Sequence, residues 1–381
     1  MKAASVGMRC AMHCHLVLDP QSKGWIIEKM CHHLGSQLQY FGHQVSIGEE
    51  PHRSADINHF MMFYRIPKVI PNRSTVAITH IDDSQRLDQA RRAVLAAEMG
   101  ICMSSMTVKQ LVNGGVSREK LCYVLPAFDG GIQPRRIIIG LTTKLYSDGR
   151  KREALLVRLA GEMDLSQFHF EIFGTGWDKL APLLREAGAL VSVAADGNDA
   201  QADYQQIRER IPHFDYYLYL GLDEGSLGTL DALGAGVKTI VTPQGFHVDL
   251  PHGITHPFWT YDELRAVFES ILEERAARVR AVAGLTWRRY AERHHFIWQT
   301  MLEGRADNLP GLLGQTSLAP LGGYAEGIDQ HLASERRRLW FRSLLRYKAT
   351  ALKQTTKRFL KKVLPRRMTA SLSRTNRAND R

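Results

Sequence analysis

Short apolar segments that alternate with helix-like segments are the feature that most constrains the fold of this chain. Residues 10–18 and 58–64 are strand-like, and 23–38 between them has apolar residues at helical spacing. The alternation stops at 126–134, which contains two prolines and two glycines, and it restarts with the apolar run 136–141. Buried strands joined by helices are typical of a parallel sheet with helices on both faces. We therefore predict an α/β fold with two doubly wound, Rossmann-like units.

The two rounds of alternation define the predicted domains. A chain of 381 residues is long for a single core, because domains cluster near ~100–200 residues. We assign 1–130 to an N-terminal domain and 131–305 to a C-terminal domain. We expect a linker at 306–330, which is rich in Gly, Leu and Pro. A basic tail follows at 331–381, which we expect to be helical up to Leu364 and disordered beyond it.

The positive charge of the chain is concentrated in this tail. Residues 331–381 contain 16 Lys and Arg and two acids, whereas the rest of the chain has 34 basic and 37 acidic residues, so the net charge of +11 arises from the tail. On a helix, Phe341, Leu345 and Phe359 would form an apolar stripe flanked by cations, which fits an anionic membrane surface. Nucleic acid is the rival partner, which we do not expect, because such a stripe serves no purpose on a polyphosphate. A disordered, solubilising tail is the remaining alternative.

The expected location of the protein is the cytoplasm. No stretch of the sequence approaches the ~18 uninterrupted apolar residues of a membrane-spanning helix. Arg9, His13 and His15 stand where a signal peptide needs an apolar run. The five cysteines have no disulfide-framework spacing and indicate free thiols in a reducing compartment. The tail would allow peripheral attachment to the inner face of the membrane.

A metal site is not predicted, although Cys10, His13, Cys14 and His15 lie close together in the sequence. On a strand, alternate residues point to opposite faces of the sheet, so these four side chains would not converge. No second pair at zinc-finger spacing follows them. We therefore assign these residues to packing.

The stretch from Asp215 to Leu250 carries the strongest functional signal. An apolar strand runs into Asp223-Glu224-Gly225, and small residues then open a helix: Ser226, Gly228 and Thr229. A helix N-terminus presents unpaired N–H groups and the positive end of its dipole, which favours phosphate. Asp231 lies seven residues after Glu224, nearly two helical turns, so the two carboxylates would share a face. Paired carboxylates beside a phosphate site suit the hydroxyl groups of a sugar and a ribose.

This stretch resembles the retaining, nucleotide-sugar-dependent glycosyltransferases of the GT-B fold, the group 1 or family 4-like enzymes. In that family an apolar strand is followed by Glu-Gly, a second acid eight positions after the first, and a small-residue helix end. Glu224-Gly225 and 232–242 match this pattern, but the chain between them is one residue short. Either Glu224 is the first acid and Asp231 follows a shortened loop, or the first acid is Asp223. We favour Glu224 because Gly225 follows it.

A second stretch, 137–151, is similar to the first strand and loop of the family's donor domain. There an Arg and, a few residues later, a Lys neutralise the diphosphate of the donor. Lys144 falls at the first of these positions, and Arg150 or Lys151 at the second. Two cations are physically sensible there, because the leaving diphosphate gains negative charge in the transition state.

Three further matches lie outside these two stretches. FEIFGTG, which ends in Gly174 and Gly176, looks like the family's strand that ends in G-x-G beside the nucleotide. His80, in VAITHIDD, matches a histidine that faces the transferred sugar. Gly24 falls where the family places a glycine beside the donor phosphates.

The resemblance implies GT-B architecture, with two Rossmann-like domains facing a cleft. It also implies a glycosyltransferase of polysaccharide biosynthesis. The N-terminal domain would bind a glycan or lipid-linked acceptor and the C-terminal domain a nucleoside-diphosphate sugar, with retention and with no metal or other cofactor. His80, Glu224 and Lys144 would be catalytic. The implied donor-binding residues are Gly24, Lys144, Arg150, Lys151, Gly174, Gly176, Glu224, Gly225, Ser226, Gly228, Thr229 and Asp231. Two alternatives stay open: a non-catalytic protein of this fold acting through its tail, and a nucleotide-sugar epimerase.

Overall fold

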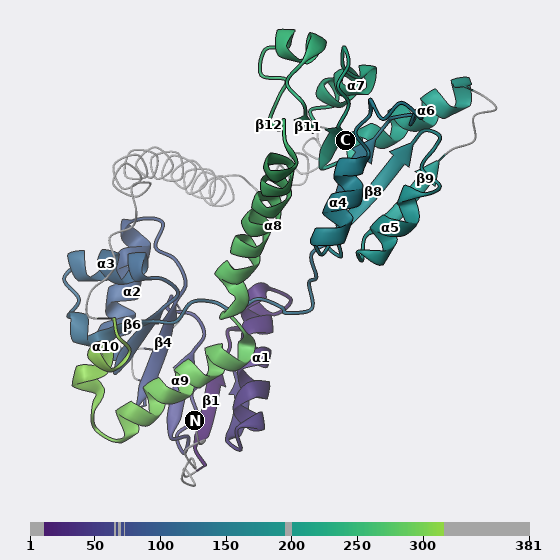
Figure 1. Ribbon diagram of the computed structural model, residues 1–381. Coiled ribbons are helices and arrows are strands. Elements are labelled where there is room, and N and C mark those ends of the chain that lie inside the picture. Colours follow the sequence, from purple (N-terminus) through teal and green to yellow (C-terminus); the bar gives the residue numbers. More distant parts are fainter. Residues whose placement is uncertain (1–10, 65, 68–69, 72, 195–199, 316–381) are drawn as a thin grey trace, which may run out of the picture. The chain divides into compact units, whose positions relative to one another are not determined.

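The computed structural model describes residues 11–315 except 65, 68–69, 72 and 195–199. These residues form two compact α/β units (Figure 1). Unit 1 comprises the described residues up to Phe128 and from Leu285 onward, and unit 2 comprises Asp129–Gly284. The expected α/β class with two doubly wound units is confirmed, because each unit contains a six-stranded, all-parallel sheet with helices.

The sheet of unit 1 has the strand order β2-β1-β3-β4-β5-β6. Its strands are β1 (His13–Val17), β2 (Gln44–Gly48), β3 (Ile57–Phe60), β4 (Ser74–Ile78), β5 (Met99–Cys102) and β6 (Leu121–Tyr123). Its first helices are α1 (Ile26–Tyr40), α2 (Ser84–Ala96) and α3 (Ser105–Asn113). Successive strand residues point to opposite faces, so Leu16 packs in the cluster with α1, and Val17 in the cluster with α2 and α3. Both faces of this sheet are therefore covered.

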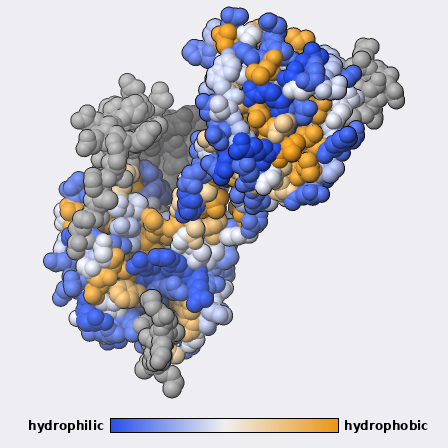
Figure 2. Space-filling view, in the orientation of Figure 1, coloured by the Kyte–Doolittle hydropathy of each residue, from blue (hydrophilic) through white to orange (hydrophobic). Residues whose placement is uncertain are grey.

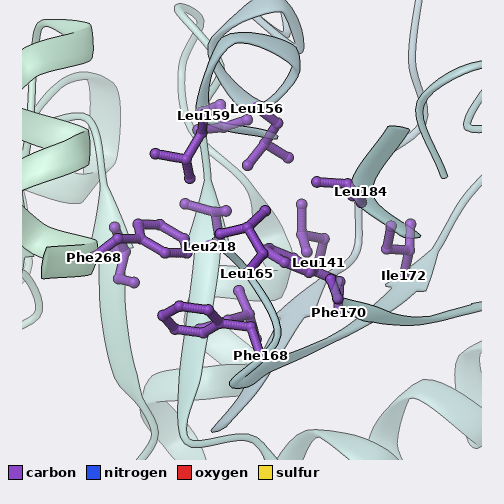
Figure 3. Packing of buried hydrophobic residues seen from close by; sticks show 14 of the residues in the cluster. Leu141, Leu156, Leu159, Leu165, Phe168, Phe170, Ile172, Leu184, Leu218 and Phe268 are labelled. Atoms are coloured by element: carbon purple, nitrogen blue, oxygen red, sulfur yellow. The ribbon is translucent and has the colours of Figure 1, made fainter. Parts of the chain in front are cut away.

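The sheet of unit 2 has the strand order β12-β11-β10-β7-β8-β9. Its strands are β7 (Ile137–Leu141), β8 (Phe168–Phe173), β9 (Leu190–Ala194), β10 (Tyr216–Tyr219), β11 (Lys238–Val241) and β12 (His256–Pro257). Its helices are α4 (Ala154–Glu162), α5 (Leu180–Glu186), α6 (Ala200–Arg210), α7 (Leu227–Gly234) and α8 (Tyr261–Ala283). Figure 3 shows Leu156 and Leu159 of α4 and Phe268 of α8 packed over Phe168 and Phe170. This cluster is the larger core of unit 2.

The segment after Gly284 differs from the sequence prediction, which placed 131–305 in one domain. The described chain returns to unit 1 at Leu285, where α9 (Trp287–Leu302) packs along α1. Its apolar stripe, which includes Ile297 and Trp298, is fully buried in the core that contains Leu34 of α1. The helical spacing of these residues predicts burial but does not specify which unit provides the core.

The first part of the expected linker at 306–330 is also folded. A 3₁₀ turn (η5, Ala306–Asn308) and α10 (Leu309–Leu312) follow α9. Gln315 then pairs with the backbone of the edge strand β6, because its side chain accepts from Tyr123 N at 3.0 Å and donates to Tyr123 O at 2.7 Å. The rest of this linker and the basic tail at 331–381 lie outside the described residues.

The surface of each unit mixes hydrophilic and apolar residues on the face seen in Figure 2. Large apolar side chains that are exposed include Trp25 and Ile26 in unit 1 and Leu227 in unit 2. Among the described helices, none combines the length and the apolarity needed to cross a bilayer.

Two buried histidines lie where α9 meets the sheet of unit 1. The ring centroids of His59 and His294 are 5.3 Å apart, and the indole of Trp298 lies beside both. Burial lowers the pKa of His294 to about 4, and burial together with the neighbouring His294 lowers that of His59 well below its ordinary value. The Nε2 atom of each ring has no hydrogen-bond partner among the described residues. Both imidazoles are therefore neutral in the folded protein at pH 7.

We expect His294 to make unit 1 less stable in acid. Its folded pKa of about 4 lies below the ~6.5 of an unfolded histidine, so the unfolded state binds more protons between these two values. The free energy of unfolding should fall once the pH drops below about 6.5, and the loss near pH 4 should be no more than about 3 kcal/mol. Denaturant unfolding at several pH values, with hydrogen exchange of α9 amides, measures this loss. His294→Leu should weaken the pH dependence, whereas the exposed His32→Leu should leave it unchanged; equal curves for wild type and His294→Leu would contradict the assignment.

Candidate functional site

The strand order of unit 2 creates a switch point between β7 and β10. From β7, the sheet is extended on one side by β8 and β9 and on the other by β10, β11 and β12. In open α/β sheets, ligands bind outside the carboxyl ends of the strands at such a point. Here these ends carry the loops 142–153 and 220–226, which contain these residues singled out from the sequence: Lys144, Arg150, Lys151, Glu224, Gly225 and Ser226.

The loops after β10 and β11 approach each other so closely that glycines are needed. Gly225 has φ 113°, and a Cβ at this position would lie 2.8 Å from the Phe246 side chain and 2.9 Å from the His247 ring. Gly245 has φ 54°, and a Cβ there would overlap the backbone of Glu224. Phe246 N donates to Glu224 O at 3.1 Å. The backbone that presents Glu224 is therefore fixed by the neighbouring loop.

Lys151 joins the loop after β7 to the loop after β10. Its Nζ lies 2.6 Å from Asp223 Oδ2 and donates to Tyr219 OH at 2.7 Å. Tyr219 donates to the other carboxylate oxygen of Asp223. Burial alone would raise the pKa of Asp223, but the hydrogen bonds from Lys151 and Tyr219 outweigh it and hold that pKa below its ordinary value. Lys151 and Asp223 therefore form an ion pair that has no net charge and that links the two loops.

Lys144 and Arg150 are the exposed cations of the loop after β7. Both lie over the ring of Tyr146, Arg150 at 4.1 Å and Lys144 at 5.8 Å from its centroid. Arg150 also pairs with Asp148 at 3.3 Å, whereas Lys144 has no salt bridge with any residue that the structure describes. Of the three cations predicted from the sequence, Lys144 is thus the most available to a bound anion.

The three acids of the motif lie in different environments. Asp223 is half-buried and engaged with Lys151. Glu224 is exposed, and Asp231 is half-buried on α7; neither forms a salt bridge within the described part of the chain. The structure therefore leaves Glu224 available to contact a ligand, and the roles of Glu224 and Asp231 toward a sugar or ribose stay predictions.

The N-terminus of α7 is held by a row of hydroxyl groups. Tyr217 OH lies 2.7 Å from Thr142 Oγ1 and 2.8 Å from Ser226 Oγ, so it links the end of β7 to the start of α7. A Cβ at Gly228 would overlap the hydroxyls of Thr142 and Tyr217, which explains why glycine is needed there. Burial raises the pKa of Tyr217, so its hydroxyl stays protonated. The first-turn N–H groups of α7 thus lie at the switch point, where a phosphate would be stabilised.

His247 is a buried residue of the site that the sequence does not predict. It lies on the 3₁₀ turn after β11 (η4, Gly245–Asp249). Its Nδ1–H donates to Thr242 O at 3.2 Å, and its Nε2 accepts from Ser226 N at 3.2 Å and from Thr229 Oγ1 at 3.0 Å. Burial lowers its pKa, although the bond to Thr242 and the charge of Asp223 oppose this. A lone histidine after a strand gives no sequence signal that separates this role from a surface position.

Gly174 and Gly176 serve the packing of two loops. Their φ angles are 145° and 91°. A Cβ at Gly174 would overlap the carbonyl of Thr143, and one at Gly176 would lie 3.0 Å from Leu145 Cβ. Trp177 Nε1 also donates to Thr143 O at 2.7 Å. The glycines therefore let the loop after β8 approach the loop after β7, and their contact with a nucleotide stays a prediction.

The predicted residues of unit 1 also follow strands of its sheet. His80 comes shortly after β4 and is exposed, with Nδ1 3.0 Å from Thr79 Oγ1 and Nε2 3.3 Å from Asp82. Gly24 follows β1, has φ 78° and donates its N–H to the Glu28 carboxylate at 2.6 Å. Nothing lies within 4 Å of a Cβ built on Gly24. The roles of both residues toward a ligand stay predictions.

The described cysteines are buried free thiols, namely Cys14, Cys31, Cys102 and Cys122. Burial raises the pKa of Cys14, Cys31 and Cys122 to about 12, so these thiols are unreactive. Within the described ranges, no three His, Cys, Asp or Glu side chains gather in a way that could hold a metal ion.

Comparisons with known proteins give similarities to solved structures. No family model matches the chain, and no curated protein matches it. The chain is similar to a glycosyltransferase from Rickettsia africae ESF-5, at 10% identity over 77% of this chain and 100% of that one, with a TM-score of 0.33. It is similar to Anabaena Alr3699/HepE in complex with UDP, at 12% identity over 80% and 99%, with a TM-score of 0.27. A third is sucrose-phosphate synthase from Thermosynechococcus elongatus, at 10% identity over 77% and 100%, with a TM-score of 0.33.

Proposed function

We propose that the protein is a glycosyltransferase that binds a nucleoside-diphosphate sugar in unit 2. The observation that carries this proposal is the exposed Glu224 at the switch point of the sheet, directly before Gly225 and the N-terminus of α7. A carboxylate accepts hydrogen bonds from sugar hydroxyls, and a helix N-terminus attracts phosphate. A nucleotide sugar has both groups a short distance apart, so it would use both features at once.

The cations of the loop after β7 support a diphosphate ligand. Lys144 and Arg150 are exposed on this loop, which adjoins the loop of Glu224 through the Lys151–Asp223 pair. Positive charge placed where a leaving diphosphate develops negative charge stabilises the transition state. In this proposal Lys144 and Arg150 bind the diphosphate, and Lys151 positions the loop.

The proposed reaction is transfer with retention and without a metal. The bond from the anomeric carbon to the diphosphate oxygen breaks, and the hydroxyl oxygen of a glycan or lipid-linked acceptor bonds to the same carbon from the same side. The acceptor proton passes to an oxygen of the leaving phosphate. Lys144, Arg150 and the start of α7 would supply the positive charge that a metal ion supplies elsewhere. Glu224 would hold the sugar and Asp231 the ribose, and unit 1 would bind the acceptor. As the family resemblance implies, His80 would face the transferred sugar and Gly24 would lie beside the donor phosphates.

The basic tail extends the proposal to location. Residues 331–381 would hold a cytoplasmic enzyme at an anionic membrane surface, where lipid-linked acceptors are found. This part of the proposal is drawn from the sequence alone.

Slow hydrolysis of the donor tests the proposed function. The full-length protein, incubated with a panel of UDP-, GDP- and TDP-sugars, should release nucleoside diphosphate from at least one of them, with or without EDTA. The double variant Lys144→Ala, Glu224→Gln should lose this release, whereas the exposed Lys179→Ala should keep it. Release from none of the donors would favour the non-catalytic alternative. Conversion of the sugar with no transfer to any acceptor would favour an epimerase.

A further inference from the structure

A second concave site lies at the amino-terminal edge of the unit 2 sheet. A pocket of about 440 Å³ opens at the starts of β7, β10 and β11, beside α8. Three of its apolar lining residues, Ile137, Tyr216 and Ile271, are buried, and the fourth, Pro134, is exposed. Its polar lining has five cations and one acid: Arg135, Arg136, Lys238, Arg275, Arg278 and Asp215. The strands run from this pocket to the switch point, so the two sites are separated by a strand length of roughly 13–17 Å.

The carboxylate of Asp215, the acid in the lining of this pocket, is already engaged in an ion pair and a backbone hydrogen bond. Asp215 forms a two-pronged ion pair with Arg135, with N–O distances of 2.7 and 2.6 Å. The same carboxylate accepts from Ile138 N at 2.8 Å, which anchors it to the start of β7. Asp215 therefore fixes the position of Arg135 and leaves the other four cations uncompensated by any acid in the lining.

Arg275 is oriented by carbonyl groups in place of a carboxylate. Its guanidinium donates to Arg135 O and, at 3.4 Å, to Gln167 O. Burial, followed by the positive charges of Arg135 and Arg278, lowers the pKa of Arg275, while Asp215 partly opposes this. The cations are thus crowded against one another, and an anion bound among them would relieve their repulsion.

The remaining cations are accessible from solvent. Arg136 and Lys238 are exposed and form no salt bridge within the described part of the chain. Lys238 Nζ lies 5.5 Å from the centroid of the Tyr216 ring, which keeps it over the pocket. Among the residues that the structure describes, Arg278 has one loose acidic partner, Glu274 at 3.8 Å. An anion that binds these cations would therefore have to break few existing ion pairs.

We propose that this pocket binds a phosphate-bearing ligand. Guanidinium groups match the geometry of phosphate oxygens, and several of them converge here around an apolar floor that can take an uncharged part of the ligand. A soluble phosphate ester and a lipid headgroup share this chemistry. The site is independent of the donor site, because it uses none of the residues at the carboxyl ends of the strands.

Arginine modification, mapped residue by residue with mass spectrometry, tests the proposal on the full-length chain. Pyrophosphate, as the soluble probe, should slow the reaction of Arg275 and Arg278 with phenylglyoxal by about fivefold or more, because phosphate covers the guanidinium. Phosphatidylglycerol vesicles are the lipid arm, and phosphatidylcholine vesicles are their neutral control. Protection by pyrophosphate identifies a soluble ligand, and protection by phosphatidylglycerol alone identifies a headgroup; either result supports the site.

Charge reversal provides the matched variants. Arg136→Glu with Lys238→Glu should abolish protection of Arg278, whereas Arg289→Glu with Arg293→Glu on α9 makes the same change in net charge and should preserve it. The proposal is overturned if neither arm protects Arg278, if protection is confined to Arg150 at the other end of the sheet, or if the first variant is protected like the wild type. Circular dichroism of both variants verifies that they are folded.

Discussion

Glu224→Gln should lower turnover with a nucleotide-sugar donor by ~10²-fold or more, a loss of about 2.7 kcal/mol of transition-state stabilisation. The substitution keeps the size of the side chain and removes its charge. Glu224 is exposed, while its backbone is fixed by Phe246 N, so the fold does not depend on the carboxylate. The loss should therefore appear in turnover and leave the thermal midpoint of the free protein nearly unchanged.

Asp223→Asn is the matched comparison for this acid. Asp223 receives hydrogen bonds from Lys151 and Tyr219, so its substitution should lower stability by about 1–2 kcal/mol and lower turnover far less than Glu224→Gln. Turnover, KM and the thermal midpoint of both variants separate the two roles. If Asp223→Asn is the crippling change and Glu224→Gln is tolerated, the acid pair is Asp223 with Asp231 and our choice of Glu224 is wrong.

The sequence predicts the two α/β units because the alternation of segments is a local signal. Strands such as β7 and β10 are short apolar runs, and such a run can be recognised in the sequence without knowing which strands pair with it. The position of α9 is a different matter. Its stripe of Ile297 and Trp298 shows that one side must be buried, but Leu34 of α1, which helps to bury it, lies far away in the chain. The sequence therefore does not show that α9 belongs to unit 1, and the predicted domain boundary at 305 differs from the observed one at Gly284.

The same distinction applies to the candidate site. The residue types and their order predict the loop of Glu224 and the start of α7, because both follow directly from strand β10. The pairing of Lys151 with Asp223 spans 72 positions, and our proposal that Lys151 positions the loop while Lys144 and Arg150 bind the diphosphate depends on it. Likewise, Arg275 on α8 reads as part of a solvated helix face, since nothing local shows that it meets Arg135. Long-range contacts of this kind depend on the packed sheet.

His247→Ala should destabilise the donor loop more than any other single change near the site. The substitution removes the acceptor of Ser226 N and Thr229 Oγ1 and the donor to Thr242 O, in a position that is 1% exposed. Each buried polar group left without a partner costs about 1–3 kcal/mol, so we expect a total loss of about 3 kcal/mol or more. Hydrogen exchange of the amides at 225–230 should accelerate accordingly, and donor binding should weaken. His213→Ala, an exposed histidine of the same unit, is the control that should change neither.

Acid should reproduce this effect in the wild type. A protonated His247 would present an Nε2–H donor to Ser226 N–H, which is itself a donor, so this hydrogen bond would be lost and only Thr229 Oγ1 could accept from the ring. Because burial lowers the folded pKa below the ~6.5 of an unfolded histidine, the stability of this loop is complete above that value and is lost as the pH falls through the folded pKa. Exchange at 225–230 should therefore speed up in acid, after correction for the intrinsic rate, in the wild type but not in His247→Ala. An acid dependence of equal size in both proteins would mean that another group controls this loop.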